Sequence, residues 1–137
     1  MLYRINEMTA SRAEHNGIPK ILIVDDNQDL GFLLQLMLED EGYEVRFAKD
    51  GSEGYLVYLL FSPDVVITDI QMPGKNGLQL METIRIHNPR ARAIYMSGDL
   101  SEYWLPLEEE RKRYQVGLLE KPFSKVDLMK LLSEAAV

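Results

Sequence analysis

Two adjacent aspartates, Asp25 and Asp26, follow directly on a run of four apolar residues, three of them β-branched. A short apolar run bounded by polar residues is typical of a strand buried on both faces. Two like charges side by side repel each other, so the pair needs either full hydration at a strand end or a cation. A second strand-like run, the apolar residues 65–67 followed by Thr68, also ends in an aspartate, Asp69. The spacing therefore predicts carboxylates at the ends of two buried strands.

Two further polar side chains, Ser97 and Lys121, come at the ends of later strand-like segments. Two or three carboxylates with few other ligands suit Mg²⁺, which keeps several waters and prefers to share a phosphate oxygen. A carboxylate in such a site can act as the nucleophile. An ammonium group and a metal ion neutralise a transferring phosphoryl group, and a hydroxyl can bond one of its oxygens. These residue types indicate phosphoryl-transfer chemistry, provided that the fold brings them together.

Strand-like and helical segments alternate along the chain from residue 20 onward. The expected strands are residues 20–26, 44–50, 64–69, 91–98 and 116–122. The expected helices are residues 27–43, 50–62, 76–88, 100–115 and 124–136. This alternation predicts a doubly wound α/β fold, in which a five-stranded parallel sheet has helices on both faces. Ligands of such sheets bind outside the carboxyl ends of the strands, so we expect the five polar side chains at one edge.

Length and composition predict one globular domain. The chain has 137 residues, of which 46% are hydrophobic, enough for one core and too few for two ordinary ones. Residues 1–18 are polar without a clear period, so we expect an N-terminal extension there and the domain over residues 19–137. The chain has no cysteine, and no apolar run approaches the ~20 residues of a membrane span. These features favour a cytoplasmic protein without disulfides or a membrane anchor.

The charge distribution argues against a nucleic-acid surface. The formal net charge is −7, whereas phosphate binding depends on clustered Lys and Arg. The one dense basic cluster, residues 111–113, follows three glutamates. It therefore predicts a mixed helix face rather than a binding stripe.

Four segments carry a family resemblance: VDDNQDL, VVITDIQMPGKNGLQL, IYMSG and LLEKPF. In this order they resemble the four blocks of the receiver domain of bacterial two-component response regulators, from about residue 20 to the C-terminus. The D-x-x-M-P-x-x-x-G segment that begins at Asp69 and the late Lys121-Pro122 pair make the set highly specific. The resemblance implies a flavodoxin-like fold with strand order 2-1-3-4-5. It also implies a phosphoacceptor rather than a turnover enzyme.

The resemblance implies a metal site at the aspartates. Asp69 would accept the phosphoryl group. Asp26, Asp69 and the main-chain carbonyl of Gln71 would bind Mg²⁺, and Asp25 would hold a metal-bound water. The adjacent aspartates would then be held together by the magnesium ion.

Two residues would act on the phosphoryl group itself. Ser97 would move toward it, and Lys121 would pair with it. The resemblance further implies that the peptide bond before Pro122 is cis, a state that non-proline bonds rarely adopt.

Leu118 departs from the family pattern, which usually has Tyr or Phe three residues before the lysine. The usual aromatic switch is therefore missing or relocated. Tyr95 and Tyr114 are candidates for a substitute, and packing in the core or at its rim is the alternative role for both.

Two helices depart from a simple pattern. Pro106 in a helix interior would cost ~3 kcal/mol or more, so we expect the first half of the fourth helix to be a loop or short turn. In the second helix, Leu56, Leu59 and Leu60 lie outside the apolar stripe that the core needs. They are either plain surface residues or the contact for a partner or the N-terminal extension.

The leading function is a receiver that takes phosphate from a sensor histidine kinase or a histidine phosphotransfer protein. It would signal to an unknown output protein through protein contacts, because the residues after Lys121 suffice for only one helix and for no DNA-binding output domain. A fragment of a larger regulator and a homodimer both stay open. The alternative, suggested by Leu118, is a pseudo-receiver that binds proteins without accepting phosphate. A Mg²⁺-dependent phosphohydrolase ranks lower, because a second aspartate two residues after Asp69 is absent.

Overall fold

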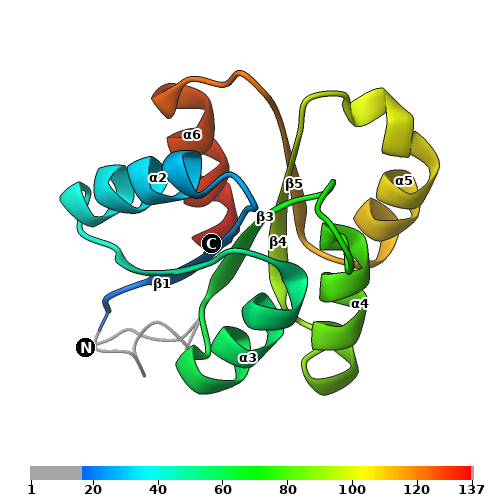
Figure 1. Ribbon diagram of the computed structural model, residues 1–137, viewed down its shortest axis with the longest axis horizontal. Helices are drawn as coiled ribbons and strands as arrows, with labels where there is room; N and C mark the ends of the chain where they lie inside the picture. Colours follow the sequence, from blue (N-terminus) through cyan, green and yellow to red (C-terminus); the bar gives the residue numbers. More distant parts are fainter. Residues whose placement is uncertain (1–16, 137) are drawn as a thin grey trace.

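Five parallel strands form one sheet in the order β2-β1-β3-β4-β5, with helices on both faces (Figure 1). This computed structural model describes residues 17–136, so the extension expected for residues 1–18 lies outside the description except for its last two residues. The strands are β1 (Lys20–Val24), β2 (Glu44–Ala48), β3 (Val65–Asp69), β4 (Arg92–Ser97) and β5 (Val116–Glu120). The α-helices are α2 (Gln28–Asp40), α3 (Gly51–Phe61), α4 (Gly77–His87), α5 (Trp104–Arg113) and α6 (Lys125–Ala136). The predicted fold class and strand order are confirmed.

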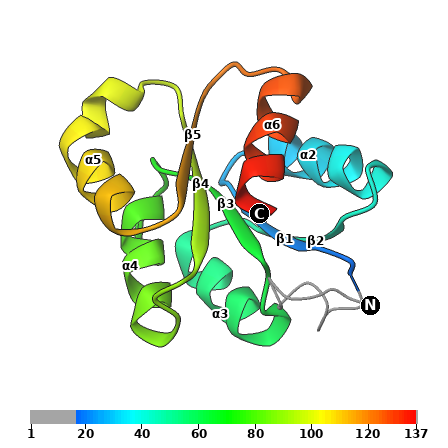
Figure 2. The ribbon, with the colours of Figure 1, turned by 180° about the vertical axis from the view of Figure 1, so that it is seen from behind.

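The sheet separates two apolar layers (Figures 1 and 2). In β1, Leu22 and Val24 face the layer that contains α3, α4 and α5, whereas Ile21 and Ile23 face the layer that contains α2 and α6. All four side chains are at most 1% exposed. The prediction of a strand buried on both faces is therefore confirmed, and a strand of this kind holds the residues that follow it in a fixed place.

Among the described helices, none is long and apolar enough to cross a bilayer.

Asparagine side chains cap the starts of α2 and α4. The side chain of Asn27 accepts a hydrogen bond from the Leu30 N–H at the start of α2. Asn76 forms a capping box with Gln79 at the start of α4, because each side chain bonds the other residue's N–H. Such caps satisfy N–H groups that a helix start leaves without partners. The caps thus fix where the connections between strands and helices end.

The fourth predicted helix is split, as expected from Pro106. A 3₁₀ turn, Leu100–Tyr103, precedes α5. Because α5 begins only at Trp104, Pro106 lies in its first turn, where the missing N–H has no helical acceptor to lose. The start of α5 has no side-chain cap. The prediction of a remodelled first half is confirmed, and the helix starts late enough to tolerate the proline.

A buried polar network fixes the second half of α5 to the rest of the fold. Glu110 in α5 pairs with Arg85 of α4 and accepts a 2.7 Å hydrogen bond from the Tyr95 hydroxyl of β4. Arg85 also lies 3.8 Å from the centre of the Tyr114 ring. Tyr95 is fully buried, and burial together with the Glu110 carboxylate raises the pKa of its hydroxyl. Tyr95 is therefore a fixed core residue, and it does not have the mobility of a switch between pocket and surface.

The leucine face of α3 is exposed. Leu56, Leu59 and Leu60 are 60%, 48% and 89% exposed, whereas Tyr58 and Phe61 pack in the core. The predicted core stripe of this helix is confirmed. Which of the proposed contacts covers the leucines stays a prediction.

Gly77 allows the start of α4 to approach the backbone of β3. A Cβ atom at this position would lie 2.3 Å from the carbonyl oxygen of Asp69, closer than any real contact allows. The Gly77 N–H also donates a 2.9 Å hydrogen bond to the Ile70 carbonyl. A side chain here would therefore push the helix away from the strand end that carries Asp69.

We predict that Gly77→Ala lowers the free energy of unfolding by about 2 kcal/mol, because the added methyl group forces the backbone to shift. Urea denaturation followed by circular dichroism measures the change. The matched control is Gly98→Ala, whose Cβ would meet no atom within 4 Å and should change stability by less than about 0.5 kcal/mol. Equal stability of the two variants would contradict the close approach at Gly77.

Candidate functional site

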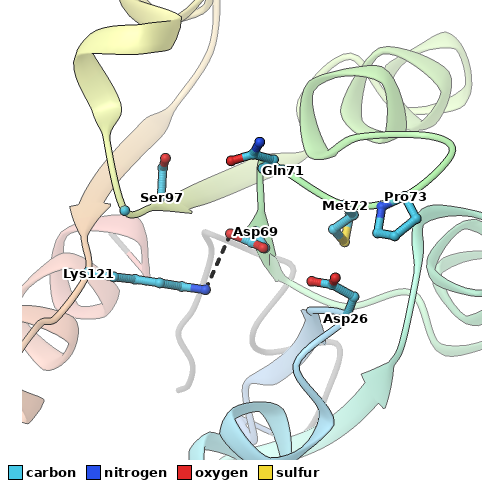
Figure 3. Close-up of a pocket in the computed structure, with 8 residues that line it drawn as sticks. Asp26, Asp69, Gln71, Met72, Pro73, Ser97 and Lys121 are labelled. Atoms are coloured by element: carbon cyan, nitrogen blue, oxygen red, sulfur yellow. Dashed lines mark ion pairs between the residues drawn. The ribbon is translucent and has the colours of Figure 1, made fainter.

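The carboxyl ends of β1, β3, β4 and β5 meet around one open pocket of about 540 Å³ (Figure 3). Asp69 ends β3, Ser97 ends β4, and Lys121 follows β5. The pocket is lined by Asp26, Asp69, Ser97, Lys121, Gln71 and the Met72–Pro73 turn. The structure thus brings together the side chains that the sequence placed at strand ends.

Asp25 lies beneath the pocket rather than in its wall. It is fully buried, and its carboxylate accepts hydrogen bonds from the Asn27 N–H at 2.9 Å and from Lys121 Nζ at 3.2 Å. Lys121 Nζ also lies 3.4 Å from a carboxylate oxygen of Asp69. One ammonium group therefore bridges the ends of β1 and β3. A buried charge is stable only with such partners.

The three aspartates form a cluster that suits a divalent cation. Carboxylate oxygens of Asp25, Asp26 and Asp69 all lie within 4.8 Å of one another. With all three ionised, their charge of −3 and the +1 of Lys121 leave a surplus of −2. Oxygen donors of this kind, open to water on one side, fit Mg²⁺, which binds through one or two carboxylates and keeps several waters. The residues present therefore fit the ion that the sequence implied.

Asp69 carries the electrostatic cost of this crowding. Its pKa is raised from 3.8 to about 6, first by burial and then by the nearby charge of Asp25, while Lys121 lowers it in part. The residue is only 7% exposed. A carboxylate kept ionised against burial and a like charge gains from any cation or bond that disperses its charge. These conditions suit a nucleophile in phosphoryl transfer.

Ser97 is bound to its own loop in this conformation. Its hydroxyl oxygen accepts a 3.0 Å hydrogen bond from the Asp99 N–H, and its main-chain carbonyl accepts one from the Lys121 N–H at 2.8 Å. Ser97 is nearly buried, at 3% exposed. A movement toward Asp69 would break the bond to Asp99 and pull on the turn that follows. The peptide bond between Lys121 and Pro122 is cis, as the resemblance implied.

Tyr103 lies in the 3₁₀ turn that connects the end of β4 to α5. Its pKa is raised by burial first, then by Glu102, Asp69 and Asp99. Asp69 is thus one of three carboxylates whose charge acts on the Tyr103 hydroxyl, which comes from the 3₁₀ turn rather than from a strand end. The other candidate aromatic residues lie elsewhere: Tyr95 is bonded to Glu110, and Tyr114 stacks on Arg85.

Comparison with known proteins identifies the family. Residues 21–133 match the model of the response regulator receiver domain, so the chain belongs to this family of phosphoacceptor signalling modules, which are not turnover enzymes. Over 112 residues it is 28% identical to the transcriptional regulatory protein RprY of Bacteroides fragilis. That alignment covers 80% of this chain and 45% of RprY, so the match spans less than half the length of this relative.

Two solved structures show the same arrangement of elements. The chemotaxis protein CheY4 of Vibrio cholerae is 28% identical, with a TM-score of 0.78, over 86% of this chain and 98% of that one. The response regulator TrrA of Thermotoga maritima, solved in complex with Mg²⁺ and BeF, is 29% identical, with a TM-score of 0.75. That alignment covers 86% of this chain and 99% of TrrA. The acidic cluster of this chain thus belongs to a fold that holds Mg²⁺ in a relative.

We predict that Asp69→Asn stabilises the metal-free protein at pH 7.5 by about 1–3 kcal/mol, because it removes a buried carboxylate charge. The folded state binds the Asp69 proton more tightly than the unfolded state does. This tighter proton binding stabilises the parent protein fully below pH 3.8, and the stabilisation of the parent is lost as the pH rises through about 6. The advantage of the variant should therefore shrink toward zero near pH 4. Urea denaturation in EDTA at several pH values measures it.

Asp29→Asn serves as the control, because Asp29 is exposed in the first turn of α2, outside the pocket lining. Its stability relative to the parent should change by less than about 0.5 kcal/mol at pH 7.5. An Asp69→Asn protein that is no more stable than the parent at pH 7.5 would contradict the raised pKa.

Proposed function

We propose that this receiver accepts a phosphoryl group on Asp69 from a histidine kinase or a histidine phosphotransfer protein and passes the signal on through protein contacts. One observation carries the proposal: Asp69 is a nearly buried carboxylate with Lys121 Nζ at 3.4 Å and two further carboxylates within 4.8 Å. This arrangement is suited to phosphoryl transfer because it provides a nucleophile, a cation and a place for a divalent metal.

In the proposed reaction a carboxylate oxygen of Asp69 attacks the phosphorus of a phosphohistidine. The new O–P bond forms as the N–P bond breaks, and the electron pair of that bond leaves with the histidine nitrogen. Lys121 lies close enough to Asp69 to neutralise the charge on the transferred oxygens. Ser97, once released from Asp99, would donate a hydrogen bond to another of these oxygens.

We propose Asp26, Asp69 and the main-chain carbonyl of Gln71 as the residues that hold Mg²⁺, with Asp25 acting through a water. When bound, the ion would neutralise charge on the phosphoryl group and lower the barrier to transfer. The position of Asp25 supports its indirect role, since it is fully buried and already bonded to Lys121 and Asn27. Asp26, in contrast, is exposed in the pocket wall.

The alternative is a pseudo-receiver that binds partners without phosphate. Leu118 favours it, because a leucine cannot act as the aromatic switch. The intact set of Asp69, Lys121 and Ser97 in one pocket supports the phosphoacceptor instead. The two functions differ in one measurable property, covalent phosphorylation.

The deciding experiment is incubation with Mg²⁺ and acetyl phosphate, followed by intact-mass measurement. We expect the mass of one added phosphoryl group, its removal by hydroxylamine, and no addition to Asp69→Asn. Hydroxylamine cleaves the mixed anhydride of an acyl phosphate but leaves a serine phosphate intact. An unmodified parent protein, or a hydroxylamine-stable phosphate on Ser97, would exclude the proposed reaction.

The same assay tests the metal ligands. EDTA should prevent phosphorylation, and Asp26→Asn should lower its rate by at least tenfold at limiting Mg²⁺. Asp29→Asn removes a nearby carboxylate outside the pocket lining and should react at the parent rate. Equal rates for both variants would remove Asp26 from the metal site.

We propose that the signal leaves the site through residues 98–108 rather than through Leu118. The Ser97 hydroxyl holds the Asp99 N–H, and the 3₁₀ turn and α5 follow directly. The start of α5 is uncapped, whereas its second half is fixed by Glu110. Phosphorylation adds roughly two negative charges beside Ser97. A loosely held start next to a fixed second half is where rearrangement costs least.

We predict that Mg²⁺ with beryllofluoride, a phosphoryl mimic, changes amide hydrogen exchange across residues 98–108 and changes the emission of Trp104. Trp104 is the only tryptophan of the chain and is 53% exposed, so its emission reports this segment alone. Asp69→Asn should show neither change. If protection changes around Leu118 and α6 while residues 98–108 stay constant, this route is wrong.

A further inference from the structure

Five cationic side chains line one pocket of about 420 Å³ at the edge of the sheet opposite Asp69. They are Arg90, Arg92, Arg111, Lys112 and Arg113, and the ring of Tyr114 lies with them. A third of the chain's 15 Lys and Arg residues thus meet in one place, although the net charge of the chain is −7. Like charges gathered in this way repel each other unless water or an anion lies between them.

The helix dipole accounts for only part of this cluster. Residues 111–113 form the last turn of α5, where positive charge is favoured. Arg111 and Lys112 also pair with glutamates one turn earlier, at 3.5 and 3.7 Å, so the predicted mixed helix face is present. Exposed pairs of this kind contribute little and leave the nitrogen donors open to further partners.

The remaining cations come from a different part of the chain. Arg90 lies in the connection from α4 to β4, and Arg92 is the first residue of β4. Pairing of the Ala93 N–H with the Gln115 carbonyl at 3.2 Å brings this strand start next to the end of α5. Within the described part of the chain, the exposed side chains of Arg90 and Arg113 have no ion pair, and no carboxylate lines the pocket.

We propose that this pocket binds a small anion that carries several linked phosphate groups, such as an inorganic polyphosphate or a nucleoside triphosphate. Four of the five cations are arginines, whose planar forks bind phosphate oxygens in pairs. The volume lies within the range of ordinary small-ligand sites. An acidic peptide spaces its carboxylates by up to ~3.5 Å per residue along the chain, whereas linked phosphates place several charges in a compact volume. The compact pocket therefore favours the phosphates.

The site is distinct from the phosphorylation pocket. β4 runs from Arg92 at the basic pocket to Ser97 at the phosphorylation pocket, and these two residues lie about 17 Å apart along the strand. In the absence of Mg²⁺ the surplus negative charge at Asp25, Asp26 and Asp69 repels anions. A phosphate ligand added in EDTA should thus reach only the basic pocket.

The test is titration of the full chain with tripolyphosphate and with ATP in EDTA at low salt. Isothermal titration calorimetry measures the binding, and amide NMR shifts locate it. We expect saturable binding of both probes, with shifts at residues 89–92 and 111–115 and none at residues 25–26, 69 and 121. Arg90→Gln/Arg113→Gln should weaken binding at least tenfold. Both side chains are exposed, so the variant should fold as the parent does.

The control is Arg46→Gln/Lys130→Gln, which removes the same charge from exposed positions elsewhere and should bind like the parent. Hexaglutamate provides the comparison between anions. Absence of saturation, equal weakening by both double variants, or tighter binding of hexaglutamate than of tripolyphosphate would overturn the proposal.

Discussion

The physical constraint on which most of this structure depends is that three carboxylates, which repel each other, are held close together. Asp25, Asp26 and Asp69 are held within 4.8 Å of one another although each would be better hydrated apart. Burial first, and then the charge of Asp25, raises the pKa of Asp69 to about 6. Because β1 and β3 are buried on both faces, these strands hold the aspartates at their ends in place. The ammonium group of Lys121 offsets only part of the negative charge. A site that holds surplus negative charge in place is prepared for a divalent cation, and through it for a phosphoryl group.

The connections around this cluster have little freedom to relax. Gly77 brings the start of α4 against the Asp69 carbonyl, and the capping box of Asn76 fixes the same turn. Lys121 is bonded to Ser97 through the main chain as well as to the aspartates through its side chain. The bond between the Ser97 hydroxyl and the Asp99 N–H, in contrast, lies at the start of the irregular segment that precedes α5. This arrangement supports the proposed route from the pocket toward α5.

In the outer half of the molecule a buried polar network lies next to Leu118. Leu118 pairs with Tyr95 in the sheet, and the Tyr95 hydroxyl is held by Glu110, which Arg85 also holds. A buried ion pair of this kind gives a helix a defined position more than it adds stability. The second half of α5 is therefore fixed by this network, whereas its start has no side-chain cap. The end of the same helix contributes three of the five cations of the basic pocket.

The sequence by itself determined the fold class, the strand order through family resemblance, and the placing of Asp25, Asp26, Asp69, Ser97 and Lys121 at strand ends. It could do so because these features depend on local patterns: apolar runs of strand length, helical spacing, and polar residues where the runs stop. Tertiary structure alone decided which side chains meet across long separations in the chain. The contacts of Glu110 with Arg85 and Tyr95 have no local signature, and neither has the pocket that Arg90 and Arg113 share, because both depend on how α5 packs against β4 and α4. The local sequence specifies which side chains each helix or strand carries, whereas tertiary packing decides which side chains of other elements they contact.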